Sequence, residues 1–115
     1  MKRGEVRWYK FTKPDKRRPA LILTRNSAID YLGEVTVAPI TRTLRNGPSE
    51  VLLTQADGLP EDCAVNLHHI QTVSKAKLGG LITILRDDRM EAIRTALLFA
   101  LDLGDPSAHL RKISL

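Results

Sequence analysis

Short runs of β-favouring residues, separated by turn-forming residues, recur along most of this 115-residue chain. The runs lie at residues 6–11, 20–23, 34–38, 50–54, 63–67, 70–73 and 81–85. Many short strands of this kind are typical of a small barrel or sandwich. Residues 20–23 are apolar throughout, which predicts a central strand covered on both faces. The strand at 34–38 is expected to bend or stop at Pro39, because proline cannot donate to a sheet ladder.

Helical spacing occurs near the C-terminal end of the sequence. At residues 87–102 the apolar side chains recur on one helix face, Asp87 or Asp88 is placed to cap the start, and Gly104 follows the end. This pattern predicts one amphipathic helix added to the β-rich part. We therefore expect a single domain over residues 1–104 and a flexible tail over residues 105–115.

Several classes of protein are disfavoured by composition. No apolar stretch approaches the roughly 20 residues needed to cross a bilayer, and the first residues lack the apolar core of a signal peptide. We expect a cytoplasmic protein with no membrane partner. The single cysteine, Cys63, cannot form an intramolecular disulfide, and the three histidines show no zinc-binding spacing. We expect neither a cofactor nor a metal.

Basic residues are concentrated at the N-terminal end of the chain. The net charge is +5, but residues 1–19 carry eight Lys or Arg against two acidic residues, a local balance of +6. The remaining residues balance at −1, with ten basic against eleven acidic side chains. A basic segment on a neutral domain is the pattern expected for a polyanion partner, since binding releases counterions. The alternative is a solvated basic surface that aids solubility.

Four short segments in a fixed order carry a resemblance to a known family. They are Gly4-Glu5-Val6, Arg18-Pro19 with the apolar strand after it, Ala38-Pro39-Ile40-Thr41, and residues 64–72 followed by the helix. In order and spacing they resemble the MazF/PemK toxins over about residues 3–103. The resemblance implies a mainly β fold, an SH3-like small barrel of short antiparallel strands with a C-terminal amphipathic helix (MazF/CcdB-like). It also implies a homodimer, metal-independent cleavage of single-stranded RNA to a 2',3'-cyclic phosphate and a 5'-hydroxyl, and neutralisation by a cognate antitoxin.

Two residues are candidates for catalysis. Metal-free RNA cleavage needs added negative charge on phosphate oxygens to be stabilised, and an arginine can grip two such oxygens at once. By resemblance, Arg18 occupies the family's catalytic arginine position, and Pro19 biases it toward an extended backbone. Thr41 matches the second catalytic position, where its hydroxyl can hydrogen-bond a phosphate oxygen. The alternatives are a solvated loop charge and an ordinary β-forming threonine.

Further polar residues are candidates for contact with RNA, either with its backbone or with its bases. They are Arg17, Arg42, Thr43, Arg45, Asn66, His68 and Gln71. His68 stands where relatives often carry an aspartate, so it is either a substitute in proton transfer or an ordinary surface histidine. Trp8 can stack on a base, but on an alternating strand it is expected to belong to the core.

Two other functions remain open from the sequence. A non-catalytic toxin on the same barrel can act on a protein such as DNA gyrase, as the CcdB relatives do, but the aromatic C-terminal end that they use is absent from residues 109–115. A plain RNA-binding module is the other alternative, favoured by the departures at His68 and Gln71. The loop between the first two strands is shorter than in many relatives, which puts a lid function in doubt.

Overall fold

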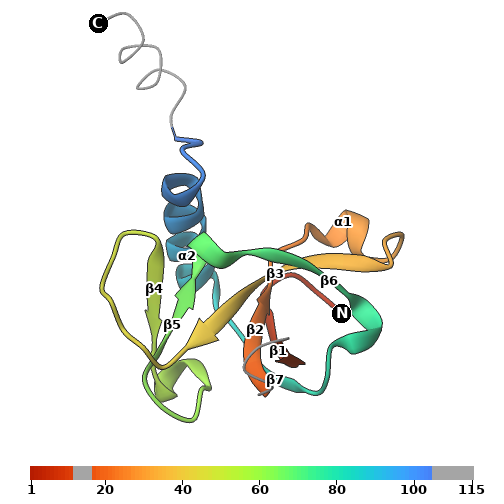
Figure 1. The fold of residues 1–115 in the computed structure, drawn as a ribbon, viewed down its shortest axis with the longest axis horizontal. Helices are drawn as coiled ribbons and strands as arrows, with labels where there is room; N and C mark the ends of the chain where they lie inside the picture. Colours follow the sequence, from red (N-terminus) through yellow and green to blue (C-terminus); the bar gives the residue numbers. More distant parts are fainter. Residues whose placement is uncertain (12–16, 105–115) are drawn as a thin grey trace, which may run out of the picture.

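A computed structural model describes residues 1–11 and 17–104 of the chain. The flexible tail expected at 105–115 and most of the basic loop after the first strand lie outside these residues. The strands form one antiparallel sheet that curls into a partly open barrel (Figure 1). They are β1 (Glu5–Lys10), β2 (Arg17–Ile22), β3 (Glu34–Thr41), β4 (Glu50–Leu53), β5 (Cys63–Asn66), β6 (Gln71–Ser74) and β7 (Leu81–Ile84).

Two helices and three short turns complete the described part of the chain. They are α1 (Asn26–Ile29), α2 (Asp87–Ala100) and the 3-10 turns η1 (Gln55–Asp57), η2 (Leu67–His69) and η3 (Lys75–Lys77). The helix α1 lies where the sequence indicated only a polar connection, and it buries Ile29. No helix in residues 1–11 and 17–104 is both long enough and apolar enough to cross a membrane.

The strand β3 is the centre of the sheet. The strand order is β4-β5-β3-β2-β1-β7, and β6 also pairs with β3, so β5 and β6 follow each other along one edge of β3 while β2 lies on the other. The pairing of β2 with β3 ends at Ala20 and Pro39. Beyond that point Ile40 and Thr41 pair only with β5. The sequence predicted that this strand bends or stops at Pro39. It does not stop there: the pairing with β2 ends at Pro39, and β3 itself continues.

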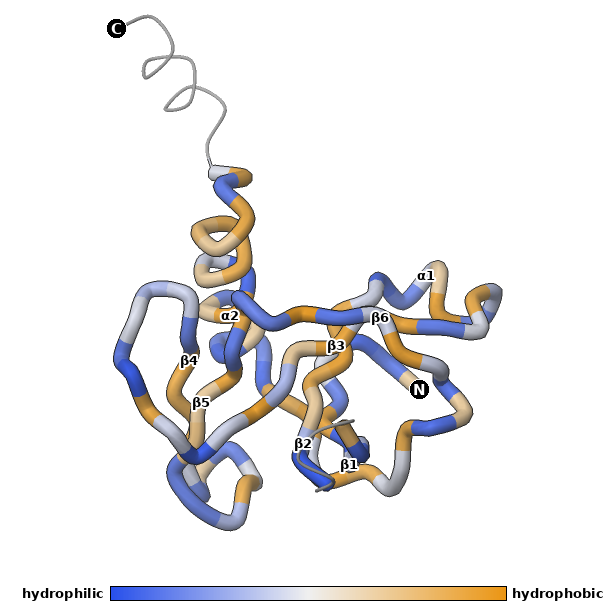
Figure 2. The backbone as a smooth tube through the Cα atoms, in the orientation of Figure 1, coloured by the Kyte–Doolittle hydropathy of each residue, from blue (hydrophilic) through white to orange (hydrophobic). Residues whose placement is uncertain are grey.

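The start of β2 also differs from the prediction. The segment 12–18 contains Pro14 and Asp15 between charged residues, a pattern that predicts a turn or loop, but Arg17 and Arg18 are in the strand, opposite Lys10 and Tyr9 of β1. Pairing with β1 holds this charged segment extended, which agrees with the bias that Pro19 imposes on the backbone of Arg18. Figure 2 shows the resulting passage of β2 from a hydrophilic start to a hydrophobic end. Both arginines consequently lie on a defined strand.

Apolar side chains fill both faces of the central strands. Leu21 belongs to one buried cluster, whereas Ala20 and Ile22 belong to the other, so the prediction of a strand covered on both faces is confirmed. The helix α2 packs on the first cluster through Ile93 and Ala96. Its N-cap is Arg86 without a side-chain cap, so the prediction that an aspartate caps it is wrong, and both aspartates lie in its first turn. The helix then projects beyond the sheet (Figure 1).

Candidate functional site

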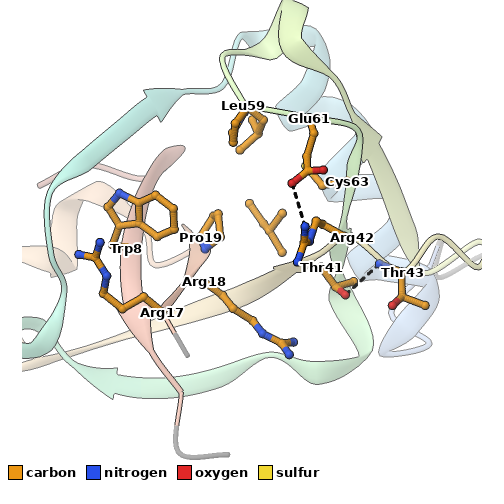
Figure 3. Close-up of a pocket in the computed structure, with 12 residues that line it drawn as sticks. Trp8, Arg17, Arg18, Pro19, Thr41, Arg42, Thr43, Leu59, Glu61 and Cys63 are labelled. Carbon is orange, nitrogen blue, oxygen red and sulfur yellow. Dashed lines mark hydrogen bonds and ion pairs between the residues drawn. The ribbon is translucent and has the colours of Figure 1, made fainter. Parts of the chain in front are cut away.

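Two adjoining depressions lie where β2 and β3 separate, and they share Arg18, Thr41 and Thr43. The first depression has a volume of about 350 Å³ and the second about 270 Å³. The walls of the first are Trp8, Arg17, Arg18, Pro19, Ile40, Thr41, Arg42, Thr43, Leu59, Pro60, Glu61 and Cys63 (Figure 3). The walls of the second are Arg18, Pro39, Thr41, Thr43, Arg45, Glu50, Asn66 and His69. Together they form a groove with the shared residues at its middle.

The backbone register explains why Arg18 and Thr41 meet. Ala20 pairs with Pro39, and the same register continued by two residues puts Arg18 opposite Thr41. Because the ladder ends at Pro39, these two side chains stand at the point where the strands part. Figure 3 shows the Arg18 guanidinium turned toward the side on which Thr41 and Thr43 lie. Within residues 1–11 and 17–104, no carboxylate pairs with this guanidinium.

The Thr41 hydroxyl is held in place by its own loop. Its oxygen accepts a hydrogen bond from the Thr43 backbone N–H at 3.1 Å. The hydroxyl hydrogen remains available for donation, since a threonine hydroxyl is one donor and an acceptor of two bonds. A guanidinium and a positioned hydroxyl donor thus lie beside each other in an open groove.

Trp8 is half-buried and forms part of the groove wall, so the expectation that it belongs to the core is wrong. The Arg17 guanidinium lies over its ring, 5.0 Å from the centroid. Both residues come from the β1–β2 hairpin, in which Trp8 pairs with Pro19. The hairpin therefore presents an aromatic ring and two arginines to the same depression.

The loop after β3 supplies most of the other predicted contacts. Arg42, Thr43 and Arg45 all line the groove. Arg42 Nη1 donates to Glu61 Oε1 at 3.3 Å, across the first depression. The Arg45 backbone N–H donates to Glu50 Oε1 at 3.0 Å, which fixes the loop without engaging the Arg45 guanidinium.

The predicted residues of β5, η2 and β6 divide into two groups. Asn66 lines the second depression, and its Oδ1 accepts from the His68 backbone N–H at 3.0 Å, capping η2. The histidine in that wall is His69, whereas His68 and Gln71 are exposed outside both depressions. The sequence indicated two separate runs here, 63–67 and 70–73, and the η2 turn lies between β5 and β6. The turn decides which histidine faces the groove, and no local signal distinguishes the two.

Leu59 and Glu61 are groove residues that the sequence analysis missed. They follow the η1 turn, which Asp57 anchors: its carboxylate accepts from Arg89 Nε at 2.9 Å and from the Thr54 backbone N–H at 2.9 Å. Burial acts to raise the pKa of Asp57, but these hydrogen bonds and the arginine charges outweigh it and hold the pKa below its ordinary value. The wall is thus tied to the first turns of α2.

The chemistry of the groove is that of an anion site. Burial, with the charges of nearby carboxylates, raises the pKa of the Cys63 thiol to about 11, so this sulfur stays protonated at neutral pH and is a poor nucleophile. Among residues 1–11 and 17–104, no cluster of three His, Cys, Asp or Glu side chains is suited to hold a metal ion. Four arginines, two from β2 and two from the loop after β3, outnumber the two carboxylates in the groove. They suit a chain of phosphates.

Known structures define the class of protein to which this fold belongs. The chain is similar to the Mycobacterium tuberculosis toxin MazF-mt6, with a TM-score of 0.80 and 35% identity over 88% of this chain and 99% of that chain. It is also similar to an endoribonuclease from a mycobacterial species, solved in complex with its cognate antitoxin, with a TM-score of 0.83 and 29% identity over 92% and 99%. The mainly β fold with a C-terminal helix, expected from the sequence, is confirmed as that of the MazF-type toxins.

Sequence comparison identifies the family. The probable endoribonuclease MazF5 of Mycobacterium tuberculosis is 44% identical over 101 residues, 87% of this chain and 92% of that protein. The probable endoribonuclease MazF2 of the same species is 40% identical over 97 residues, 83% and 93%. Residues 2–101 match the family of PemK-like, MazF-like toxins of type II toxin-antitoxin systems, and the chain belongs to that family.

Proposed function

We propose that this MazF-type toxin is an endoribonuclease that cleaves single-stranded RNA in the groove, with Arg18 and Thr41 at the scissile phosphate. The observation that carries the proposal is the Arg18 guanidinium, unpaired among the described residues, beside the positioned Thr41 hydroxyl in an arginine-lined groove. Three of the similar proteins above are named as an endoribonuclease or a probable endoribonuclease, which supports the same activity here.

The reaction needs no metal ion. The 2'-hydroxyl of the RNA loses its proton and attacks the adjacent phosphorus, while the bond from phosphorus to the 5'-oxygen breaks and that oxygen takes up a proton. The products are a 2',3'-cyclic phosphate and a 5'-hydroxyl. Arg18 stabilises the charge that accumulates on the non-bridging oxygens, and Thr41 donates to one of them. The groove position of His69 makes it a better candidate than His68 for carrying a proton.

Partners follow from the same groove. A cognate antitoxin would neutralise the enzyme by covering the arginines that hold RNA, and one similar endoribonuclease was solved with its antitoxin.

Phe99, near the end of α2, and Leu103, just beyond it, are exposed at 57% and 61%, which supports a homodimer that buries them. Light scattering of the purified protein measures its mass in solution and so distinguishes a homodimer from a monomer. A toxin that acts on cellular RNA would work in the cytoplasm, and we propose that it does so as a single domain over residues 1–104.

The experiment is cleavage of a long defined RNA by the purified protein in EDTA, followed by sequencing of the new 5' ends. We expect cuts at one short motif, with 5'-hydroxyl ends. Arg18→Ala should lower kcat/KM by about 100- to 1,000-fold, the usual cost of removing one donor to a charged transition state. Arg94→Ala, at an exposed position on α2, is the matched control and should keep full activity.

Two outcomes would contradict the proposal. RNA that is bound but never cut would indicate an RNA-binding module, and RNA that is neither bound nor cut would favour a toxin acting on a protein such as gyrase. Undiminished cleavage by Arg18→Ala would remove the catalytic assignment.

A further inference from the structure

The first depression has a composition that the catalytic reaction does not require. The pair Arg18 and Thr41 accounts for one end of it, but Trp8 and Leu59 give it apolar walls, and Glu61 adds a carboxylate. A carboxylate repels the RNA backbone, so its presence beside a catalytic arginine calls for another role. Carboxylates in nucleic-acid sites accept hydrogen bonds from amino groups of bases.

Trp8 offers a surface on which a base can stack. The Arg17 guanidinium lies over its ring at 5.0 Å from the centroid, so the ring is held by a cation on one side and borders the depression. Stacking of an unpaired base on an aromatic side chain is the usual way in which proteins hold single-stranded RNA. Figure 3 shows Trp8 and Glu61 on opposite sides of the depression. A base lying between them would have its ring against Trp8 and one edge toward Glu61.

The Glu61 carboxylate is available to such a base. It pairs with Arg42 at 3.3 Å, but the two side chains are 56% and 75% exposed. An ion pair this exposed is weak and can rearrange around a ligand. Adenine, cytosine and guanine each present an exocyclic amino group that can donate to a carboxylate. Uracil has none, and its ring N–H lies between two carbonyl oxygens that a carboxylate repels.

We propose that the first depression is a base-recognition pocket for a nucleotide beside the scissile phosphate, in which Glu61 selects a base with an exocyclic amino group against uracil. Trp8 stacks the ring, and Arg42 donates to a ring nitrogen or carbonyl oxygen next to the amino group. The position beside the scissile phosphate rests on the proposed nuclease function. The selectivity itself rests only on the walls of the pocket.

Binding can be measured without cleavage. Trp8 is the single tryptophan of the chain, so its fluorescence reports directly on this pocket. The probes are 2'-O-methyl RNA tetramers, which lack the attacking hydroxyl: UUUU and the tetramers in which one position is A, C or G. We expect every tetramer to quench Trp8, and at one position the amino-bearing bases to bind about tenfold more tightly than uracil, the order expected for one base contact.

Glu61→Gln tests the role of the carboxylate. A carboxamide also donates to uracil carbonyls, so we expect the tenfold preference to fall to about one. Losing a negative charge strengthens binding of all tetramers alike, and the ratio between tetramers is therefore the readout. Glu91→Gln, an equal charge change at an exposed position on α2, should raise affinity slightly and keep the ratio.

Any of three results would contradict the proposed base-recognition pocket. The tetramers could leave Trp8 fluorescence unchanged, the wild-type protein could bind UUUU as tightly as the tetramers with A, C or G, or the preference against uracil could persist in Glu61→Gln. Glu61 is more than half exposed, so the variant should fold. The two proposals fail separately. Selective binding of tetramers without any RNA cleavage would contradict the nuclease proposal and leave the base-recognition proposal standing. RNA cleavage together with an unchanged base preference in Glu61→Gln would contradict the base-recognition proposal only.

Discussion

At the scale of single residues, Arg18 and Thr41 offer different groups to a bound phosphate. Arg18 supplies a full positive charge with several donors, and Thr41 supplies one hydroxyl whose oxygen is fixed by the Thr43 N–H. A hydroxyl fixed in advance needs no reorientation when charge develops on the phosphate. Thr41 should therefore contribute to the rate of the chemical step rather than to RNA affinity.

Thr41→Val should lower kcat for cleavage of a short defined RNA by about 100-fold, because one donor to the developing charge is lost. KM should change little, which single-turnover and steady-state kinetics together will show. Thr41→Ser keeps the hydroxyl and the bond from Thr43, and should retain most of the activity. Equal rates for the valine variant and the wild type would assign Thr41 a structural role only.

Asp57 gives a prediction about stability and pH. Its side chain is 1% exposed and is paired with Arg89. Burial disfavours its ionised form, but the hydrogen bonds and arginine charges prevail and lower its pKa. Because the folded pKa lies below the unfolded one, the stabilisation is complete above the ordinary aspartate pKa and is lost as the pH falls through the folded pKa.

Asp57→Asn should reduce the free energy of unfolding by about 2 kcal/mol at neutral pH, through loss of charged hydrogen bonds. The difference from wild type should begin to narrow below about pH 4, where the Asp57 carboxyl of the unfolded chain is protonated, and should narrow further as the pH falls through the lower pKa of the folded state. Urea unfolding of both proteins, from neutral pH to below about pH 4, measures this difference in the free energy of unfolding. Asp88→Asn removes an exposed pairing with Arg86 and should cost about 0.5 kcal/mol or less. A difference that stays constant down to low pH would contradict the assigned pKa.

At the scale of elements, the turn after η1 joins the core to the groove wall. Gly58 has φ of +92°, a conformation that favours glycine, and a Cβ there would overlap the Thr83 hydroxyl oxygen. That hydroxyl donates to the Asp57 carbonyl at 3.1 Å, so the turn is packed directly against β7. The conformation of this turn sets the direction of the backbone for the next residues, Leu59 to Glu61.

Gly58→Ala should lower the free energy of unfolding by about 2 kcal/mol or more, because it adds both backbone strain and a steric clash. It should also weaken the discrimination against uracil in the tetramer assay. Gly33→Ala is the control, since an added Cβ there meets nothing within 4 Å. Its stability should change by about 1 kcal/mol at most. Equal stability of the two variants would mean that the turn is not a constraint.

The elements also show what sequence alone can give. The β-rich runs and the helix were located because their hydrophobic periodicity is local, and the motifs around Arg18 and Thr41 pointed to two strands that line the groove. The sequence did not give the structure where the extent of a strand, or the position of a side chain, depends on contacts with residues far away in the chain. The start of β2 depends on β1, the continuation of β3 past Pro39 depends on β5, and Glu61 and His69 reach the groove through turns fixed by tertiary packing.

At the scale of the whole molecule, charge and shape act together on RNA. The chain carries a net charge of +5, and the groove gathers Arg17, Arg18, Arg42 and Arg45. Binding to a polyanion through these side chains should release counterions and weaken as salt is added. The number of arginines that meet phosphates can therefore be counted from the salt dependence.

Arg45→Gln should reduce the slope of log K against log salt by about 0.7, the value for one phosphate contact on a single strand. Arg45 suits this test because its guanidinium forms no ion pair within residues 1–11 and 17–104 and its side chain lines the second depression. Fluorescence anisotropy with a 2'-O-methyl RNA measures the slope. Arg94→Gln on α2 should leave it unchanged, and the same slope for both variants would exclude Arg45 from the RNA path.

The central position of β3 has a consequence for when the toxin becomes active during its synthesis. Arg18 and Thr41 both belong to the first part of the chain. The strand β3, however, is paired with β5 and β6, which the ribosome synthesises later. A ribosome that stops after β3 and before β5 releases a fragment that contains both proposed catalytic residues but lacks the strands that complete the groove. We expect abandoned translation products to be harmless, so that the message encoding this enzyme is spared until a finished copy has been released.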